Sequence, residues 1–108
     1  MELTQHPDDD QSLDTGSLAP LVSVLIPAFN RAAYIHETVE SVLSQNYENI
    51  ELIVIDDGST DGTYEILAQY AEDGKITLLT HPGRDNRGQA ASLNLGLQSA
   101  RGDYVAIL

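Results

Sequence analysis

The 108-residue sequence contains no cysteine, and only five of its residues are lysine or arginine. Without cysteine there are no disulfides and no thiolate ligands for a metal, which fits a reducing compartment. No apolar run approaches the roughly 20 residues of a membrane-spanning helix, and the N-terminus lacks the basic and then apolar pattern of a signal peptide. These absences lead us to expect a cytoplasmic protein.

The scarcity of cations leaves a formal net charge of -12. Residues 1–20 carry five acids and neither lysine nor arginine, so the other 12 acids and all five cations lie in residues 21–108. Such an acidic surface repels phosphate backbones, which argues against general nucleic-acid binding. Three cations, Lys75, Arg84 and Arg87, lie within 13 residues, and their local positive potential suits a phosphorylated ligand.

The chain divides at about residue 20. Residues 1–20 have no apolar periodicity and are rich in Asp, Ser, Thr and Gln, so we expect a disordered acidic tail. In residues 21–108, apolar runs alternate with helical stripes in the order β-α-β-α-β-α-β. This order predicts an α/β fold, with a parallel sheet of about four strands and helices on its faces. The expected strands are 21–26, 50–55, 75–80 and 104–108, and the expected helices lie around 35–43, 63–71 and 90–100.

Pro27 is predicted to end the first strand, since proline has no N–H for a sheet ladder. Pro27-Ala28-Phe29-Asn30 is then a loop, with Asn30 as the N-cap of the first helix. Phe29 either stacks on a base or packs against that helix. In the third helix, the predicted apolar face consists of Ala90, Leu93, Leu97 and Ala100.

The sharpest change in the sequence follows the apolar run 52–55, where Asp56 and Asp57 come directly before Gly58. A buried strand followed by acids and small residues indicates a strand-to-helix turn, and ligands of open α/β sheets bind at the carboxyl ends of strands. Neighbouring side chains point in opposite directions, so we expect one acid to face the ligand while the other holds the turn. The alternative is that both acids only cap the next helix, near Ser59 and Asp61.

A second candidate site is the loop 81–88. Arg84 and Arg87, with the backbone N–H groups of Gly83 and Gly88, can meet a diphosphate in front of the third helix. The alternative is a loop with ordinary surface arginines. His81 has no partner at metal-ligand spacing, and neither a Ser-His-Asp nor a zinc constellation is discernible in the sequence.

Three blocks of the sequence resemble the family 2 inverting glycosyltransferases. The first block is Val22–Asn30 together with Glu40–Gln45, and the second is Ile53–Thr63. The third comprises Asn86-Arg87-Gly88, Asn94-Leu95-Gly96 and Ala100–Tyr104. The blocks follow one another in the order and at the spacing of the family and cover about residues 21–108.

This resemblance implies the Rossmann-like GT-A fold and a nucleotide-sugar donor, with UDP as the expected nucleotide. It implies that the loop 27–30 lies against the base and ribose, that Asp57 binds the base, and that the loop 86–88 and Asn94 border the nucleotide and sugar. Asp56, Ser59 and Asp61 are expected to support the turn. With the candidates above, the expected nucleotide-binding residues are Pro27, Ala28, Phe29, Asn30, Asp57, Gly58, Arg84, Asn86, Arg87, Gly88 and Asn94.

The sequence departs from the family pattern in two places. The family often has Ala-Arg-Asn where this chain has Ser92-Leu93-Asn94, so a phosphate or base contact is lost. The family's Asp-x-Asp motif, which ligates Mn²⁺ or Mg²⁺, directly follows the strand that ends here at Leu108. The resemblance therefore implies that the metal ligands, the catalytic base and the acceptor-binding half lie outside this chain.

We therefore predict the N-terminal nucleotide-binding part of a glycosyltransferase, truncated before the Asp-x-Asp motif. The whole enzyme would transfer a sugar to an acceptor hydroxyl with inversion, while residues 1–108 alone would bind no metal and be inactive. The acceptor stays open, as does attachment to the inner face of a membrane through the absent part. The alternatives are a non-catalytic nucleotide-binding or interaction module, and a piece that does not fold alone. The coding DNA beyond codon 108 would distinguish the fragment from a natural short protein.

Overall fold

The computed structural model describes residues 2–5, as backbone only, and residues 19–108. From β2 onward, strands and helices alternate in the predicted order. The elements are β1 (Glu2–Gln5), β2 (Val22–Ala28), α1 (Ile35–Leu43), β3 (Ile50–Asp56), α2 (Thr63–Glu72), β4 (Thr77–Thr80), the 3-10 helix η2 (Pro82–Arg84), α3 (Gln89–Ser99) and β5 (Tyr104–Ile107).

The strands form one sheet in the order β1-β5-β2-β3-β4. The last four are mutually parallel, which confirms the predicted four-stranded parallel sheet. β1 pairs antiparallel with β5, with Glu2 opposite Ile107. The prediction of a disordered tail was therefore wrong for Glu2–Gln5, because the outer edge of β5 has unpaired backbone groups that a fifth strand can use. The rest of the predicted tail, residues 1 and 6–18, lies outside the described residues.

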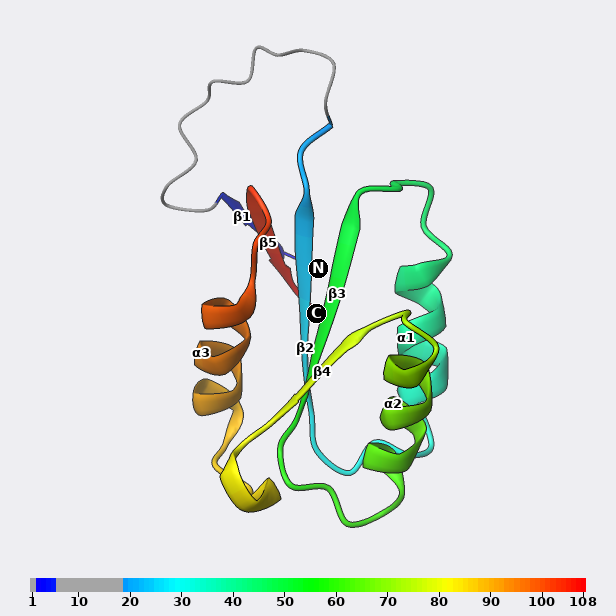
Figure 1. Cartoon of the computed structure of the whole chain (residues 1–108), viewed down its shortest axis with the longest axis vertical. Helices are drawn as coiled ribbons and strands as arrows, with labels where there is room; N and C mark the ends of the chain where they lie inside the picture. Colours follow the sequence, from blue (N-terminus) through cyan, green and yellow to red (C-terminus); the bar gives the residue numbers. More distant parts are fainter. Residues whose placement is uncertain (1, 6–18) are drawn as a thin grey trace.

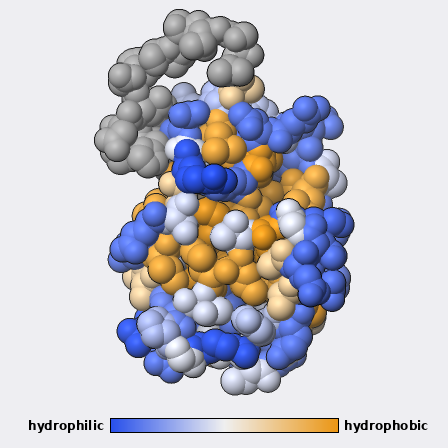
Figure 2. Space-filling model, viewed as in Figure 1, coloured by the Kyte–Doolittle hydropathy of each residue, from blue (hydrophilic) through white to orange (hydrophobic). Residues whose placement is uncertain are grey.

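The sheet lies between two helical layers, with α1 and α2 on one face and α3 on the other (Figure 1). Side chains alternate between the faces along each strand, so β3 contributes Leu52 and Val54 to the core under α1 and α2. It contributes Ile53 and Ile55 to the core under α3. Hydrophobic residues accordingly gather in the middle of the molecule between the layers (Figure 2). Among the helices of residues 19–108, none has the length and apolar composition needed to cross a membrane.

Helix α3 packs on the sheet through small residues. Ser92 and Gly96 are buried, whereas Leu97, which we placed on the apolar face, is 45% exposed. A Cβ on Gly96 would lie 2.8 Å from Cδ1 of Ile55, so the absence of a side chain allows the close approach. The predicted face of α3 was therefore confirmed for Leu93 and Ala100, which pack against the core under this helix, and wrong for Ala90 and Leu97, which are exposed. The periodicity of large apolar residues does not detect the close contact made by glycine and serine.

β2 continues through Pro27 to Ala28, so the prediction that the strand ends at Pro27 was also wrong. The Leu25 carbonyl accepts the Leu108 N–H on the β5 side at 3.0 Å, and the Ala28 carbonyl accepts the Asp57 N–H on the β3 side at 2.8 Å. Alternate residues of a strand turn their backbone groups to the same neighbour. The Pro27 nitrogen therefore points to the β5 side, away from β3, so the proline interrupts no bond of the ladder between β2 and β3.

At the amino end of the sheet, Glu51 of β3 joins three segments. Its carboxylate accepts the Ser23 hydroxyl at 2.5 Å and the Arg101 N–H at 2.7 Å, and Nε of Arg101 lies 3.1 Å from its other oxygen. Ser23 Oγ in turn accepts the Gly102 N–H at 2.8 Å. Burial raises the pKa of Glu51, but the bonds from Ser23 and Arg101 and the arginine charge together hold it below the ordinary value.

Candidate functional site

The predicted site lies at the carboxyl ends of the strands, at the point where the order in which strands are added to the sheet reverses. β3 and β4 extend the sheet on one side of β2, and β5 lies on the other side. Such a reversal leaves a crevice outside the strand ends, the usual ligand position in open α/β sheets. The loops that follow β2, β3 and β4 meet at this end, the lower end in Figure 1.

Asp57 anchors the loop that follows β4. Its Oδ1 accepts the Arg87 N–H at 2.6 Å and the Gly88 N–H at 3.2 Å, and its Oδ2 accepts the Gly88 N–H at 2.9 Å. Asn86 adds a bond from its side-chain amide to the Asp57 carbonyl at 2.9 Å. The structure thus brings together Asp57 and the segment 86–88, which the sequence predicted as parts of one site.

Asp56 points to the opposite face and holds the turn. Its side chain is fully buried, and its Oδ2 accepts the Ser59 N–H at 3.2 Å. Within residues 19–108, its Oδ1 has no hydrogen-bond partner. α2 begins after Gly62, with no side-chain bond to its cap. The alternative that both acids only cap this helix was therefore wrong.

Asp61 bonds the first residue of α2 and the loop after β2. Its Oδ1 accepts the Thr63 N–H at 3.0 Å and the Thr63 hydroxyl at 2.5 Å, while its Oδ2 accepts the Ala32 N–H at 3.1 Å. The Thr63 hydroxyl contributes most to a pKa of Asp61 below its ordinary value. Through these bonds Asp61 joins the loop after β2 to the start of α2, which is a supporting role of the kind expected for it.

Asn30 connects two loops rather than capping α1. The helix begins at Ile35 after Tyr34, so the prediction of Asn30 as its N-cap was wrong. Asn30 has a φ of 51°, a left-handed conformation that asparagine tolerates better than most residues. Its N–H donates to Ser59 Oγ at 2.9 Å, and its Oδ1 accepts the Thr60 N–H at 2.8 Å. The loop after β2 is therefore fixed against the loop after β3.

A cavity of about 430 Å³ opens beside Asp57, within the size range of small-molecule sites. Two of its walls come from the loop after β2 and from the segment 86–89. The rim includes Phe29, whose side chain is 42% exposed. Six of the eleven expected nucleotide-binding residues line it, namely Pro27, Ala28, Phe29, Asp57, Asn86 and Gly88, and Arg31 and Gln89 complete the lining.

The two loop arginines do not converge on one point. The Arg84 guanidinium lies 3.6 Å from the ring centroid of Tyr64 in α2, and Nη2 of Arg87 lies 3.4 Å from an Asp85 oxygen. The structure thus gives each guanidinium a protein partner instead of the shared diphosphate site that we predicted. The charged residue that does line the cavity besides Asp57 is Arg31, which sequence reasoning missed.

Gly58 and Asn94, the other expected residues, lie outside the cavity lining. A Cβ on Gly58 would lie 2.7 Å from the Asn86 backbone nitrogen, so glycine here permits the close approach of the two loops. Asn94 is exposed on α3. The predicted contacts of Gly58 and Asn94 with the nucleotide therefore stay predictions.

His81 lies behind Asp57 and was also missed. Its Nε2 lies 3.0 Å from Ser92 Oγ and 3.5 Å from Oδ1 of Asp57, and all three residues are buried. The sequence showed only that His81 has no partner at metal-ligand spacing, and it did not reveal Ser92 and Asp57, because the fold joins residues from three separate segments. Serine and aspartate share one imidazole nitrogen and Ser92 is fully buried, so the trio lacks the relay geometry of a nucleophilic triad.

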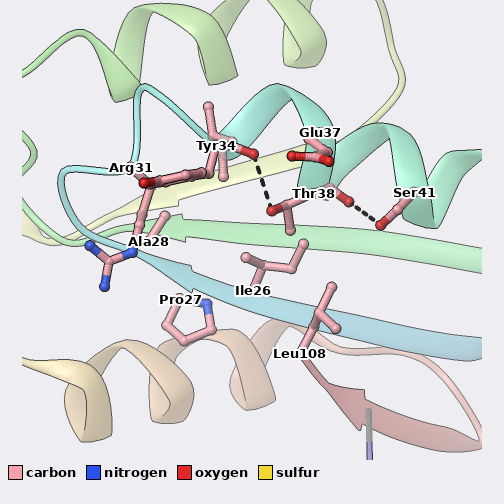
Figure 3. Close-up of a pocket in the computed structure, with 10 residues that line it drawn as sticks. Ile26, Pro27, Ala28, Arg31, Tyr34, Glu37, Thr38, Ser41 and Leu108 are labelled. Carbon is pink, nitrogen blue, oxygen red and sulfur yellow. Dashed lines mark hydrogen bonds between the residues drawn. The ribbon is translucent and has the colours of Figure 1, made fainter.

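A second hollow, of about 600 Å³, lies on the α1 side of β2 and shares Pro27, Ala28 and Arg31 with the cavity beside Asp57. Leu108 and Tyr34 also line it (Figure 3). Its threonine and serine hydroxyls are already engaged, because Thr38 donates to the Tyr34 carbonyl at 3.2 Å and Ser41 to the Thr38 carbonyl at 2.8 Å. The cavity beside Asp57, with its buried carboxylate, is therefore the better candidate for ligand recognition.

The part of the chain that the structure describes holds no group of three or more His, Cys, Asp or Glu side chains arranged to bind a metal ion. The Mn²⁺ or Mg²⁺ implied by the resemblance therefore does not fit the described residues.

The sequence matches known proteins over most of its length. The model of the family described as Glycosyl transferase family 2 matches residues 23–108. The putative teichuronic acid biosynthesis glycosyltransferase TuaG of Bacillus subtilis (strain 168) is 46% identical over 90 residues, which are 82% of this chain and 35% of TuaG. An uncharacterized glycosyltransferase of Haemophilus influenzae is 43% identical, with the same shares. The chain thus spans about a third of the length of these relatives.

Solved structures show the same arrangement of strands and helices. The mannosyltransferase PcManGT from Pyrobaculum calidifontis, in complex with GDP-Man and Mn²⁺, is 32% identical with a TM-score of 0.69, over 82% of this chain and 27% of that one. S. aureus TarS 1-349, in complex with UDP-GlcNAc, is 28% identical with a TM-score of 0.73, over 82% and 26%. The expected GT-A fold is confirmed for the matched portion.

Proposed function

Since the chain belongs to glycosyl transferase family 2, we propose that it is the nucleotide-binding part of an enzyme that transfers a sugar from a nucleoside diphosphate sugar to an acceptor hydroxyl. The observation that carries this proposal is the cavity beside Asp57, at the carboxyl ends of β2 and β3. We further propose a UDP-linked donor and inversion at the sugar. UDP-GlcNAc bound to TarS supports the choice of uridine.

The lining of the cavity suits a nucleoside. The Asp57 carboxylate accepts hydrogen bonds, as the ring N–H of uracil requires, and the exposed ring of Phe29 offers a stacking surface for the base. The backbone of Pro27 and Ala28 forms the adjoining wall, against which we place the ribose. Arg31 supplies positive charge at the same rim, where we place the diphosphate.

The described residues supply neither metal ligands nor a catalytic base in our proposal. The Asp-x-Asp motif, the base and the acceptor-binding residues are placed outside residues 1–108, because the match covers only 35% of the length of these relatives. We therefore expect the 108-residue polypeptide to bind nucleotide without transferring sugar.

Calorimetric titration of the purified chain with UDP tests the binding proposal. We expect Phe29→Ala to weaken UDP binding about tenfold, the effect of losing one stacked base, without a change in unfolding temperature. Leu97→Ala is the matched control, since Leu97 has a similar exposed fraction, 45% against 42%, on a helix outside the cavity. Absence of UDP binding by the folded chain, or equal effects of the two variants, would contradict the proposal.

Inactivity is tested separately, by incubating the chain with UDP-GlcNAc and Mn²⁺ and measuring released UDP. We expect release at the rate of the protein-free control. Release above that rate would show that residues 1–108 contain a complete catalytic centre.

A further inference from the structure

The buried contact between His81, Ser92 and Asp57 has a consequence for the ligand. His81 directly follows β4, Ser92 lies in α3, and Asp57 directly follows β3. We propose that His81 is a positioning residue, which holds the Asp57 carboxylate in the orientation that recognises the nucleotide. This proposal rests on the proposed function for the identity of the ligand, and on the contacts within the protein for the role of His81.

The surroundings determine which imidazole nitrogen carries hydrogen. Nε2 of His81 lies 3.5 Å from Oδ1 of Asp57, and an ionised carboxylate only accepts hydrogen bonds. A lone pair on Nε2 would face the lone pairs of that oxygen, whereas an Nε2–H is attracted by it. The same N–H points to Ser92 Oγ at 3.0 Å. His81 therefore carries its hydrogen on Nε2 and donates it to Ser92 Oγ, with the carboxylate oxygen in electrostatic contact at 3.5 Å.

The two oxygens of Asp57 have different surroundings. Oδ1 accepts the N–H groups of Arg87 and Gly88 and faces His81, whereas among the described residues 19–108 the Gly88 N–H is the single donor to Oδ2. Each carboxylate oxygen has two lone pairs, so Oδ2 keeps the capacity for one more donor. Because Asp57 lines the cavity, we assign Oδ2 as the oxygen that accepts the N–H of the base.

His81 helps to keep Oδ1 on the protein side and Oδ2 free for the base. With only 6% of its surface exposed, it leaves little room for water to take its place beside Oδ1. Ser92, its other partner, is tied to the same loop, since its N–H donates to the Gly88 carbonyl at 3.1 Å. Without the Nε2–H, Oδ1 loses the attraction of that N–H dipole on its buried side. The N–H groups of Arg87 and Gly88 still bind the carboxylate, but its preference for the orientation that presents Oδ2 becomes weaker.

Two substitutions of similar length and shape separate positioning from packing. His81→Gln keeps an N–H donor at the end of an unbranched side chain, and His81→Met has nearly the same shape without a donor. We expect UDP affinity within about twofold of wild type in His81→Gln, and a loss of about fivefold in His81→Met, which corresponds to the roughly 1 kcal/mol of one ordinary hydrogen bond. A role in packing alone would affect both variants equally.

Amide exchange of Arg87 and Gly88, measured by NMR in the free protein, gives a readout that needs no nucleotide. We expect both amides to exchange faster in His81→Met than in wild type and His81→Gln. If this holds while wild type fails to bind UDP, the proposed function is wrong and the positioning of the carboxylate stands. Equal exchange and equal affinity in the two variants would overturn the inference.

A third measurement needs no variant and so does not depend on whether a substituted chain folds. The nitrogen and proton resonances of the His81 ring distinguish the two tautomers in wild type. We expect a hydrogen on Nε2 with slow solvent exchange. A ring with Nε2 unprotonated would overturn the inference directly.

Discussion

At both ends of the sheet a carboxylate accepts backbone N–H groups, but the bonds close the structure at one end and leave a cavity at the other. At the amino end the Glu51 carboxylate accepts the N–H of Arg101, and at the carboxyl end the Asp57 carboxylate accepts those of Arg87 and Gly88. In both cases an acid of β3 or its end fixes a segment far along the chain. Yet Asp57 lines a cavity, while the partners of Glu51 pack directly against one another.

A glycine at each end shows the difference. A Cβ on Gly102 would lie 2.6 Å from both the backbone nitrogen and Oγ of Ser23, so the amino end has no space for a side chain. A Cβ on Gly88 would meet nothing within 4 Å, but this glycine has a φ of +95°. Glycine is thus required by close packing at one end and by backbone conformation at the other, where open space remains for a ligand.

The largest expected effect on stability comes from Gly102→Ala. The new methyl group overlaps backbone atoms of β2 that cannot move without disturbing the sheet, so the free energy of unfolding should fall by about 3 kcal/mol. Gly88→Ala should cost less, about 1–2 kcal/mol, because only the left-handed backbone disfavours alanine there. Urea unfolding measures both. Equal losses would show that the two ends are equally tightly packed.

Ser23→Ala should destabilise the amino end by about 2 kcal/mol. It leaves the buried Gly102 N–H without its acceptor and removes a donor to Glu51, and an unsatisfied buried group usually costs 1–3 kcal/mol. The control is Ser41→Ala, which removes an exposed hydroxyl bonded to its own helix. A loss below that of the control would mean that water replaces the serine oxygen.

The third prediction concerns pH. Because Glu51 has a lowered pKa in the folded protein, from an ordinary value of 4.5, its ionised form stabilises the fold above that pH, and this contribution disappears as pH falls through the folded-state pKa. Glu51→Gln should therefore lower the free energy of unfolding by about 1 kcal/mol at pH 7 and by less in strong acid. Urea unfolding of both proteins at several pH values tests this, with the exposed Glu48→Gln as the control. A difference that grows toward acid would contradict the sign.

The smallest effect separates Arg31 from Arg84 at the carboxyl end. Arg31 lines the cavity and Arg84 stacks on Tyr64, so Arg31→Ala should weaken UDP binding about threefold to fivefold, within the range of exposed ion pairs. Arg84→Ala should leave UDP affinity unchanged and lower stability by about 0.5 kcal/mol. The reverse order of affinities would restore the diphosphate role that the sequence suggested for Arg84.

Much of the fold could be predicted because the parallel strands are continuous apolar runs, such as 52–55, separated by loops rich in glycine, proline, asparagine and aspartate. The failures have physical causes. β1 is a short polar segment whose pairing depends on an edge supplied by β5. The close contact of α3 with the sheet is made by Ser92 and Gly96, which carry no hydrophobic signal. Pro27 stays in its strand because its nitrogen points away from β3, which depends on the register of the strand rather than on its composition.

The site was predictable where a residue directly follows a strand. Asp57 was placed at the site on that basis, the family resemblance added the loop 86–88, and the structure joins the two. His81 directly follows β4 in the same way, so its position in the sequence could have indicated that it belongs to the site. Its partner Ser92 lies in a helix, and only the tertiary packing brings the two residues together. The direction of the Arg84 side chain depends on Tyr64, a contact that no local pattern indicates.

The pairing of β2 with β5 bears on the order in which the molecule assembles. The N–H of Leu21 is bonded to the carboxylate of Asp103, 82 positions away, whereas β2, β3 and β4 follow one another along the chain with one helix between each pair. Closing a long loop costs more chain entropy than closing a short one, and distant pairings slow folding. We therefore expect β2, β3 and β4 to form the early folding nucleus and β5 to join last. During synthesis on the ribosome, one edge of the central strand thus stays unpaired until residues 104–107 have been made.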